Sequence, residues 1–302
     1  MGNKSKLTLA TLACTILIPE FASADPIPEP IIQIIREAAK TGNAATLQTT
    51  VNLAKTTNPR SVAEIDGLVA SLQRESEAAR IARVSTEGFF EGWKGEGEIG
   101  ASLTTGTSKN KTVAVGINLM KDGLNWRHKL VGIANYVRSD DTTTADRYLA
   151  SYQADYKFTP RLFAYGLLQW EQDRFAGYNR RYTESLGLGY TIVDTPEFNW
   201  QVSAGPALRQ TRFITHESES ATTGHAGTIF LWNISPTTVF TEDLGTYLGG
   251  SDNTYFSTTA LTTKVMGDIS ARASFNVTSE SNPPPGIDST NTITRLTLVY
   301  SF

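Results

Sequence analysis

The last twelve residues of the chain, 291–302, constrain its fold most strongly, because they alternate in polarity and end on an aromatic side chain. Read with a period of two, the apolar face carries Leu296, Leu298, Tyr300 and Phe302. The opposite face is mainly polar and includes Arg295. This alternation predicts a strand with one apolar and one polar face. A terminal strand of this kind is typical of the closing strand of a bacterial outer-membrane β-barrel, since lipid tolerates no unpaired strand edge.

The amino terminus has the pattern of a secretory signal peptide over residues 1–24. Lys4 and Lys6 are followed by an apolar core at 7–18, and Ala22 and Ala24 offer a cleavage site. A transmembrane anchor is the competing interpretation, but the apolar run is shorter than the roughly 20 residues that a span needs. The pattern therefore favours export from the cytoplasm.

Cys14 is the only cysteine in the chain, and it leaves a second alternative open. It follows Leu12 and Ala13, as in a lipoprotein signal, although Thr11 stands where an aliphatic residue is expected. If the leader is cleaved at Ala24, the mature protein has no cysteine. No disulfide, thiol nucleophile or cysteine-ligated metal is then expected.

Composition excludes several further classes of protein. The net charge is −3, without the basic patch that nucleic-acid binding would require. No other stretch approaches 18 unbroken apolar residues, so membrane-spanning helices are not expected. Modest hydrophobicity suits a barrel, in which only every second strand residue faces lipid.

Residues 25–91 have helical periodicity and predict a periplasmic extension. Apolar residues recur at helical spacing over 31–39, 44–54 and 65–84, and Ser61 and Glu64 form a capping-box pattern. These helices form either a small bundle or a loosely ordered extension, since so short a segment has little core.

From residue 92 to 302 the composition changes to Val, Thr, Tyr and Gly in alternating patterns, which predicts an all-β barrel domain. Twelve strands are expected, at 93–105, 112–120, 126–138, 147–158, 161–172, 181–193, 199–212, 225–233, 237–247, 254–264, 268–279 and 291–302. A water-soluble β-sandwich also explains strands, but it would bury aromatic side chains at strand centres. Here they lie near strand ends, as in the interfacial girdles of a membrane barrel.

The predicted connections alternate in length, which indicates the topology. Short turns are expected near Gly123, Pro160, Pro196, Pro236 and Gly267. Longer polar loops are expected at 106–111, 139–146, 173–180, 213–224, 248–253 and 280–290. Outer-membrane barrels place short turns in the periplasm and long loops outside the cell. An even strand count then puts the helical extension and the C-terminus on the periplasmic side.

Several stretches resemble the YdiY-type family of salt-induced outer-membrane proteins. The resemblance lies in residues 158–166, 170–178 and 187–190, and residues 100–108 look like the family's first hairpin, with Thr107 where Asn is usual. It covers about 92–302 and leaves the helices unexplained. It implies an outer-membrane barrel of unknown function, and the link to salt rests on the family name alone.

Polar side chains on the inward faces are candidates for lining the lumen: Lys94, Glu96, Glu98, Asp155, Lys157, Arg209, Arg272 and Arg295. They either line a narrow aqueous path that selects charged solutes, or form a hydrogen-bonded network that fills the lumen. Twelve strands lie between filled eight-stranded barrels and open porins, so strand number leaves both possible. Closure of the last strand on the first predicts that Arg295 meets Glu96 or Glu98.

The most distinctive predicted loop carries Asp173, Arg174, Arg180 and Arg181. Its arginines either bind phosphates of surface lipopolysaccharide, as guanidinium groups do well, or fix the loop locally. The aspartates at 140, 141 and 146 match no calcium loop, so a solvated loop is favoured there.

An enzyme is not expected. Some twelve-stranded outer-membrane barrels are phospholipases, and His216 and Ser218 have suitable spacing, but they lie in a polar loop without an evident third group. The three histidines show no metal-ligand pattern.

The sequence thus predicts a monomeric, twelve-stranded, antiparallel transmembrane β-barrel in the outer membrane of a Gram-negative bacterium. A porin-like narrow channel is the first functional hypothesis, a filled envelope-stress barrel the second, and a lipid hydrolase a remote third. No cofactor, metal or nucleic acid is expected. The expected partners are outer-membrane lipid, lipopolysaccharide and the barrel-assembly machinery, for which Leu298, Tyr300 and Phe302 form the assembly signal.

Overall fold

The computed structural model describes residues 26–105, 110–139, 142–174 and 176–302. Three helices precede the barrel: α1 (Glu29–Lys40), α2 (Ala44–Thr57) and α3 (Val62–Thr86). The strands are β1 (Lys94–Thr105), β2 (Asn110–Asp122), β3 (Trp126–Ser139), β4 (Thr142–Lys157), β5 (Leu162–Asp173), β6 (Tyr178–Asp194), β7 (Phe198–Phe213), β8 (Ser218–Ser235), β9 (Thr238–Leu248), β10 (Thr254–Met266), β11 (Ile269–Glu280) and β12 (Thr290–Ser301). The predicted leader, Thr107, Asp140 and Asp141 lie outside the described residues.

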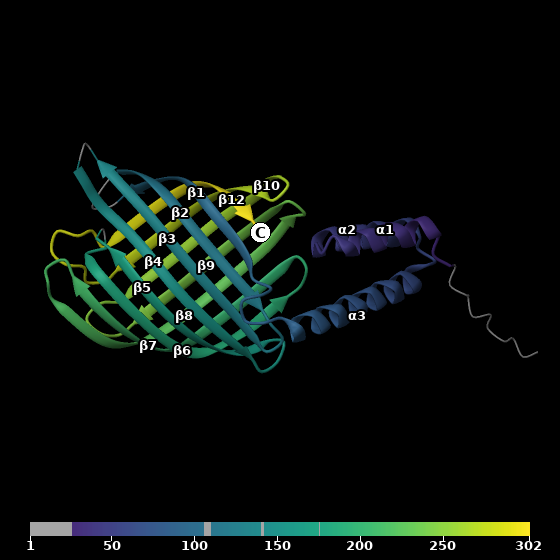
Figure 1. Cartoon of the computed structure of the whole chain (residues 1–302), viewed down its shortest axis with the longest axis horizontal. Helices are drawn as coiled ribbons and strands as arrows, with labels where there is room; N and C mark the ends of the chain where they lie inside the picture. The colour runs from purple at the N-terminus through teal and green to yellow at the C-terminus, as the bar shows by residue number, and fades with distance from the viewer. Residues whose placement is uncertain (1–25, 106–109, 140–141, 175) are drawn as a thin grey trace, which may run out of the picture.

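The twelve strands form one closed antiparallel barrel, as the sequence predicts. Each strand pairs with its neighbours in the chain, and β12 closes the sheet on β1 with Glu98 opposite Val299. The backbone groups of Gly95 and Phe302 exchange two hydrogen bonds of 2.9 Å, so pairing continues to the last residue. Figure 1 shows the closed wall and the helices beyond one end of it. Closure leaves no strand edge unpaired, which a membrane requires.

The two faces of the wall differ in polarity in the sense expected for a membrane barrel. In β6, the polar Arg181, Thr183 and Ser185 are buried inside, whereas Leu186 and Leu188 face outward and are exposed. Along β12 and at the residue that follows it, the side chains of Leu296, Leu298, Tyr300 and Phe302 are likewise 55–68% exposed on the outer face. An apolar outer surface around a polar interior identifies a transmembrane barrel.

The strands at the end opposite the helices are longer than predicted. β6 begins at Tyr178 and β8 at Ser218, so the predicted loops 173–180 and 213–224 shrink to 174–177 and 214–217. The β7–β8 ladder continues to the pair Arg212–Ser218. Threonine and serine are frequent in this stretch of β8. Such residues can form a polar, paired strand as readily as a loop exposed to water. Polarity alone therefore does not distinguish the two.

The helical extension packs into a small bundle, which settles the choice left open by the sequence. Ile35, Val51, Ala54 and Ile65 are each at most 5% exposed and form its core. Asn43 caps α2 by accepting a hydrogen bond from the Thr46 backbone at 3.0 Å. The predicted capping box at Ser61 is wrong: Ser61 makes no side-chain cap, and Glu64 accepts from the backbone N–H of Ile27 instead.

Beyond Leu72, α3 leaves the bundle and runs toward the barrel as a single, solvent-exposed helix. Its surface is charged and is braced by an ion pair between Arg80 and Glu77 at 2.8 Å. None of the helices in the described ranges is long and apolar enough to cross a membrane.

Candidate functional site in the barrel lumen

The central feature of the lumen is an ion pair that crosses it. Arg181 of β6 donates from Nη1 to Oε1 of Glu280 in β11 at 2.7 Å, and each side chain is only 3% exposed. Four strands, β7 to β10, lie between the two along the shorter way round the wall. The contact therefore spans the interior instead of following the sheet.

Hydroxyl and guanidinium groups extend this contact to further strands. Thr254 of β10 donates to Oε2 of Glu280 at 2.5 Å and accepts from Nη1 of Arg209 at 2.7 Å. Arg209 comes from β7, and its guanidinium lies 4.6 Å from the centre of the Tyr247 ring. Charge-assisted hydrogen bonds and cation–π contact thus hold both arginines.

Aromatic groups continue the network toward the other wall. The ring of His225 in β8 packs against that of Tyr247 in a tilted arrangement, with ring centres 4.8 Å apart. Its Nδ1 lies 2.9 Å from the hydroxyl of Tyr165 in β5. We call the resulting set the cross-lumen network: Tyr165, Arg181, Arg209, His225, Tyr247, Thr254 and Glu280. It joins β5 to β11 through side chains alone.

The network lies in a densely packed interior. Among the residues whose burial the structure describes, eleven strands contribute inward side chains that are less than 9% exposed, for example Ala114, Asn135, Asp155, Phe163, Arg181, Arg209, Thr223, Tyr247, Thr254, Glu280 and Arg295. Charged groups in such surroundings are stable only when paired and hydrogen-bonded. Many of these side chains pair with one another, whereas the buried amide of Asn135 and the Nε of Arg295 have no hydrogen-bond partner among the described residues.

Glu96 and Glu98 of β1 face inward, as predicted, but their partner differs from the prediction. Arg272 of β11 binds Glu96 at 2.7 Å and Glu98 at 3.2 Å. Arg295 instead stands opposite Ser102, farther from the helical end. Arg272 reaches across β12, where its ladder partner Thr297 also donates to Glu98 at 3.4 Å. The predicted contact of Arg295 with a first-strand carboxylate is therefore wrong.

Two other predicted lumen residues, Asp155 and Lys157, form local pairs. Asp155 is fully buried and accepts from Arg127 and Gln153 at 2.7 and 2.6 Å, with Lys129 at 3.7 Å. Lys157 binds Asp122 at 2.6 Å at the end where the short turns lie. Lys94 is exposed at the start of β1.

The four residues assigned to the predicted loop at 173–181 separate into two groups. Arg174 is exposed in the β5–β6 connection, and Arg180 is exposed on β6. Asp173 ends β5, is buried, and forms an ion pair of 3.1 Å with Arg147. Arg181 belongs to the cross-lumen network. The loop assignment is thus corrected for Asp173, Arg180 and Arg181, because β5 and β6 continue to these positions. The side chains of Asp173 and Arg181 turn inward and are buried.

Most members of the cross-lumen network were not singled out by the sequence. Glu280 fell in a predicted loop and Thr254 at a strand end, while Tyr165, His225 and Tyr247 read as ordinary strand residues. The sequence did contain a signal for two of them. By alternation, Tyr165 lies on the same face of β5 as the polar Gln169, and Tyr247 lies on the same face of β9 as Asp243. Bulky aromatic groups on a polar inner face indicate a lumen that is filled.

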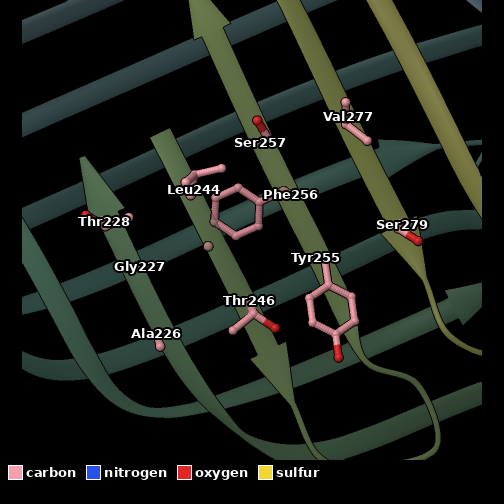
Figure 2. A pocket seen from close by; sticks show the side chains of 11 residues that line it. Ala226, Gly227, Thr228, Leu244, Thr246, Tyr255, Phe256, Ser257, Val277 and Ser279 are labelled. Carbon is pink, nitrogen blue, oxygen red and sulfur yellow. The ribbon is translucent and has the colours of Figure 1, made fainter. Parts of the chain in front are cut away.

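A groove of about 510 Å³ lies elsewhere, across β8 to β11. Figure 2 shows Thr228, Leu244, Tyr255, Ser257 and Val277 around it. Most of its lining residues lie on the same face of the sheet as the exposed Leu244 and Tyr255, which is the face directed away from the lumen. The groove therefore belongs to the lipid-facing wall and is not part of the lumen.

The residues considered for catalysis lie at a turn. His216 has a positive φ of 71° in the β7–β8 connection, and Ser218 begins β8. Between residues 176 and 302 no hydrogen bond joins these two side chains. His128 faces outward to the Tyr152 hydroxyl, and His225 lies in the lumen. Across the described residues no group of three His, Cys, Asp or Glu is placed to hold a metal. The absence of an enzymatic activity stays a prediction.

Comparison with solved structures returns bacterial barrels of low sequence identity. The NanC porin is 9% identical, with a TM-score of 0.48, over 68% of this chain and 100% of that one. The KdgM porin is 12% identical, with a TM-score of 0.41, over 68% and 99%. The translocator domain of the autotransporter NalP from Neisseria meningitidis is 11% identical, with a TM-score of 0.41, over 77% and 96%.

Sequence comparison gives the family. The uncharacterized protein YdiY of Escherichia coli (strain K12) is 25% identical over 209 residues, which are 68% of this chain and 82% of that protein. The model of a family described as a protein of unknown function, DUF481, matches residues 97–302. Because this match covers nearly the whole barrel and more than half of the chain, the protein belongs to the DUF481 family, the YdiY-type family that its sequence resembles.

Proposed function

We propose that this protein is an outer-membrane barrel whose lumen is sealed by the cross-lumen network, so that it serves the cell envelope as a filled barrel. The observation that carries the proposal is the buried Arg181–Glu280 pair, which closes the interior between opposite parts of the wall. Passive flow of solutes needs a continuous water-lined path, as in the open porins. For a barrel without such a path, we propose a structural role in the cell envelope under osmotic stress.

The location in the outer membrane is part of the proposal. It is supported by the apolar outer face, since closed β-barrels are the strand architecture that spans membranes. The short turns and the helices lie at one end, where Asn43 of the extension donates to the backbone of Pro236 at 3.2 Å. By the rule that short turns are periplasmic, the extension projects into the periplasm.

The proposed partners follow from this orientation. Arg174 and Arg180 are exposed at the outer end, where guanidinium groups meet lipopolysaccharide phosphates. Leu298, Tyr300 and Phe302 form an exposed row ending at the periplasmic rim, as a signal for the assembly machinery requires. We propose a monomer without cofactor or nucleic-acid partner.

A narrow channel is the second candidate, and one observation favours it. Several inward side chains in the half nearer the helices remain exposed, among them Asn118, Ile229, Asp243 and Lys264. A water-accessible, mixed-charge recess therefore reaches toward the middle of the barrel from the periplasmic side. In this alternative, the cross-lumen network is a constriction that moves to admit solutes.

Planar-bilayer recording of the purified full chain separates the two candidates. We expect no stepwise conductance from the wild type and small steps from the double variant Arg181→Ser/Glu280→Ser, which removes the lumen-spanning pair. Arg174→Ser, an exposed arginine near the same end, should leave the bilayer silent. Stepwise, ion-selective conductance of the wild type would overturn the sealed barrel and favour the channel. Heat-modifiable electrophoretic mobility, measured in parallel, shows whether each variant is folded.

A further inference from the structure

A tight turn between α3 and β1 presents two phenylalanines to the outside. The backbone N–H of Glu91 donates to the Gly88 carbonyl at 3.1 Å, and the Glu91 carboxylate accepts from the Gly88 N–H at 3.0 Å. These bonds place Phe89 and Phe90 at the tip, where they are 53% and 88% exposed. Turn tips in water normally carry Gly, Pro, Asn, Asp or Ser. An apolar tip indicates an apolar environment.

The turn is fastened to the barrel wall by one lysine. Lys121 of β2 donates from Nζ to the carbonyl oxygens of Gly88, Phe89 and Glu91, the last at 2.7 Å. Its side chain is only 8% exposed although it lies at the end of the strand. Lys121 lies on the same face of β2 as the exposed Val115 and Ile117, so it reaches the turn from the outer face of the barrel.

The turn is continuous with the aromatic side chains of the outer wall. The Phe89 ring lies 5.5 Å from His128 and 6.0 Å from Trp93. His128 stacks on Trp126 at 6.0 Å, and Trp126 meets Tyr156 at 5.0 Å. Trp126 is 49% exposed on the lipid-facing side at the short-turn end. Aromatic residues at this position mark the boundary between lipid and water in membrane barrels.

We propose that the Gly88–Glu91 turn is a membrane-interface anchor, with Phe89 and Phe90 inserted among the phospholipids of the leaflet next to the short turns. The occupant is lipid because the turn extends a surface that already faces the bilayer. The anchor fixes the point at which α3 leaves the membrane. A helix of 25 residues is roughly 37 Å long, so the bundle at its far end is held well clear of the bilayer.

The test uses the full chain with Cys14→Ser and a single cysteine labelled with an environment-sensitive fluorophore, refolded into phosphatidylcholine vesicles. The probe is placed by Phe90→Cys at the tip. Leu186→Cys, 69% exposed on the barrel wall, is the lipid-facing control, and Ile81→Cys, 44% exposed on α3, is the water-facing control. Doxyl-labelled lipids then report contact with the acyl chains by quenching.

We expect the probe at position 90 to emit at shorter wavelength than at position 81 and to be quenched most by lipids labelled near the headgroup. The same emission and the same lack of quenching at positions 90 and 81 would overturn the anchor. Adding Lys121→Met should reduce the quenching at position 90 at least twofold while heat-modifiable mobility persists. Unchanged quenching in the folded Lys121→Met protein would overturn the role of the lysine as the fastener. Neither result depends on whether the lumen conducts.

Discussion

Arg181 and Glu280 meet across the lumen with 2.7 Å between Nη1 and Oε1, although four strands separate them along the shorter way round the wall. Neighbouring strands of a barrel are already joined by their backbones, so side chains add little to that pairing. A contact between distant strands is different, because it ties opposite parts of the wall together. This pair therefore bears both on the stability of the barrel and on its permeability.

Removing one partner of this pair should destabilise the folded barrel strongly. In Arg181→Met, Glu280 is left buried with only the Thr254 hydroxyl as a close donor. An unpaired buried charge of this kind costs about 3–5 kcal/mol. The free energy of unfolding in urea, measured in lipid vesicles, is expected to fall by that order.

The double variant Arg181→Met/Glu280→Met provides the matched comparison. It removes both charges, so no unpaired group remains, and it should be more stable than Arg181→Met alone. A double variant less stable than the single one would show that packing, and not the buried charge, dominates at this position. The exposed Arg174→Met should change the unfolding free energy by less than about 0.5 kcal/mol.

The sequence predicted the wall of the barrel better than its interior, for a physical reason. The strand alternation that placed Leu298 outside and Arg209 inside is a local property with a period of two. The contact of Arg181 with Glu280 depends on the barrel diameter, the strand tilt and the position at which each strand ends. Both residues stood in stretches polar enough to resemble loops. Polar strands that face a lumen and polar loops that face water have the same composition.

A second close approach, between β6 and β7, should make the barrel sensitive to a single methyl group. A Cβ added to Gly205 would stand 2.0 Å from the carbonyl oxygen of Leu186, a backbone atom that cannot rotate away. Gly205→Ala should therefore lower the unfolding free energy by about 1–3 kcal/mol through overpacking. Gly97→Ala is the control, since nothing lies within 4 Å of its added Cβ. Equal effects of the two substitutions would count against a steric origin.

The contact of Arg272 with Glu96 and Glu98 should contribute a smaller, salt-dependent stabilisation. Its side chains are partly exposed, at 22%, 36% and 18%, so water and ions screen the attraction. Arg272→Ala should cost about 1 kcal/mol at low salt and less at high salt. Thermal denaturation in detergent at two sodium chloride concentrations measures the difference. A loss that is independent of salt would indicate packing of the arginine stem instead of charge.

The assignment of this contact illustrates a further limit of sequence reasoning. Closure of β12 on β1 was predicted, and Arg295 was the nearest cation in the closing strand. The observed partner comes from β11, because the long Arg272 side chain passes over Thr297 to reach the first strand. Strand adjacency can be derived from topology, whereas the partner of a long, flexible side chain depends on its rotamer and reach, which strand pairing does not determine.

The helical bundle should unfold independently of the barrel when its small core is damaged. Ile35 is fully buried against Val51 and Ile65, and Ile35→Ala creates a cavity that costs about 2–5 kcal/mol. A bundle of this size has little more stability than that. Trypsin should therefore cut the extension of Ile35→Ala at least tenfold faster, while heat-modifiable mobility of the barrel is unchanged. Ile34→Ala, at a neighbouring position that is 55% exposed, should be cut at the wild-type rate. If both variants are cut at that rate, the extension owes its order to something other than its own core, such as its contacts with the barrel.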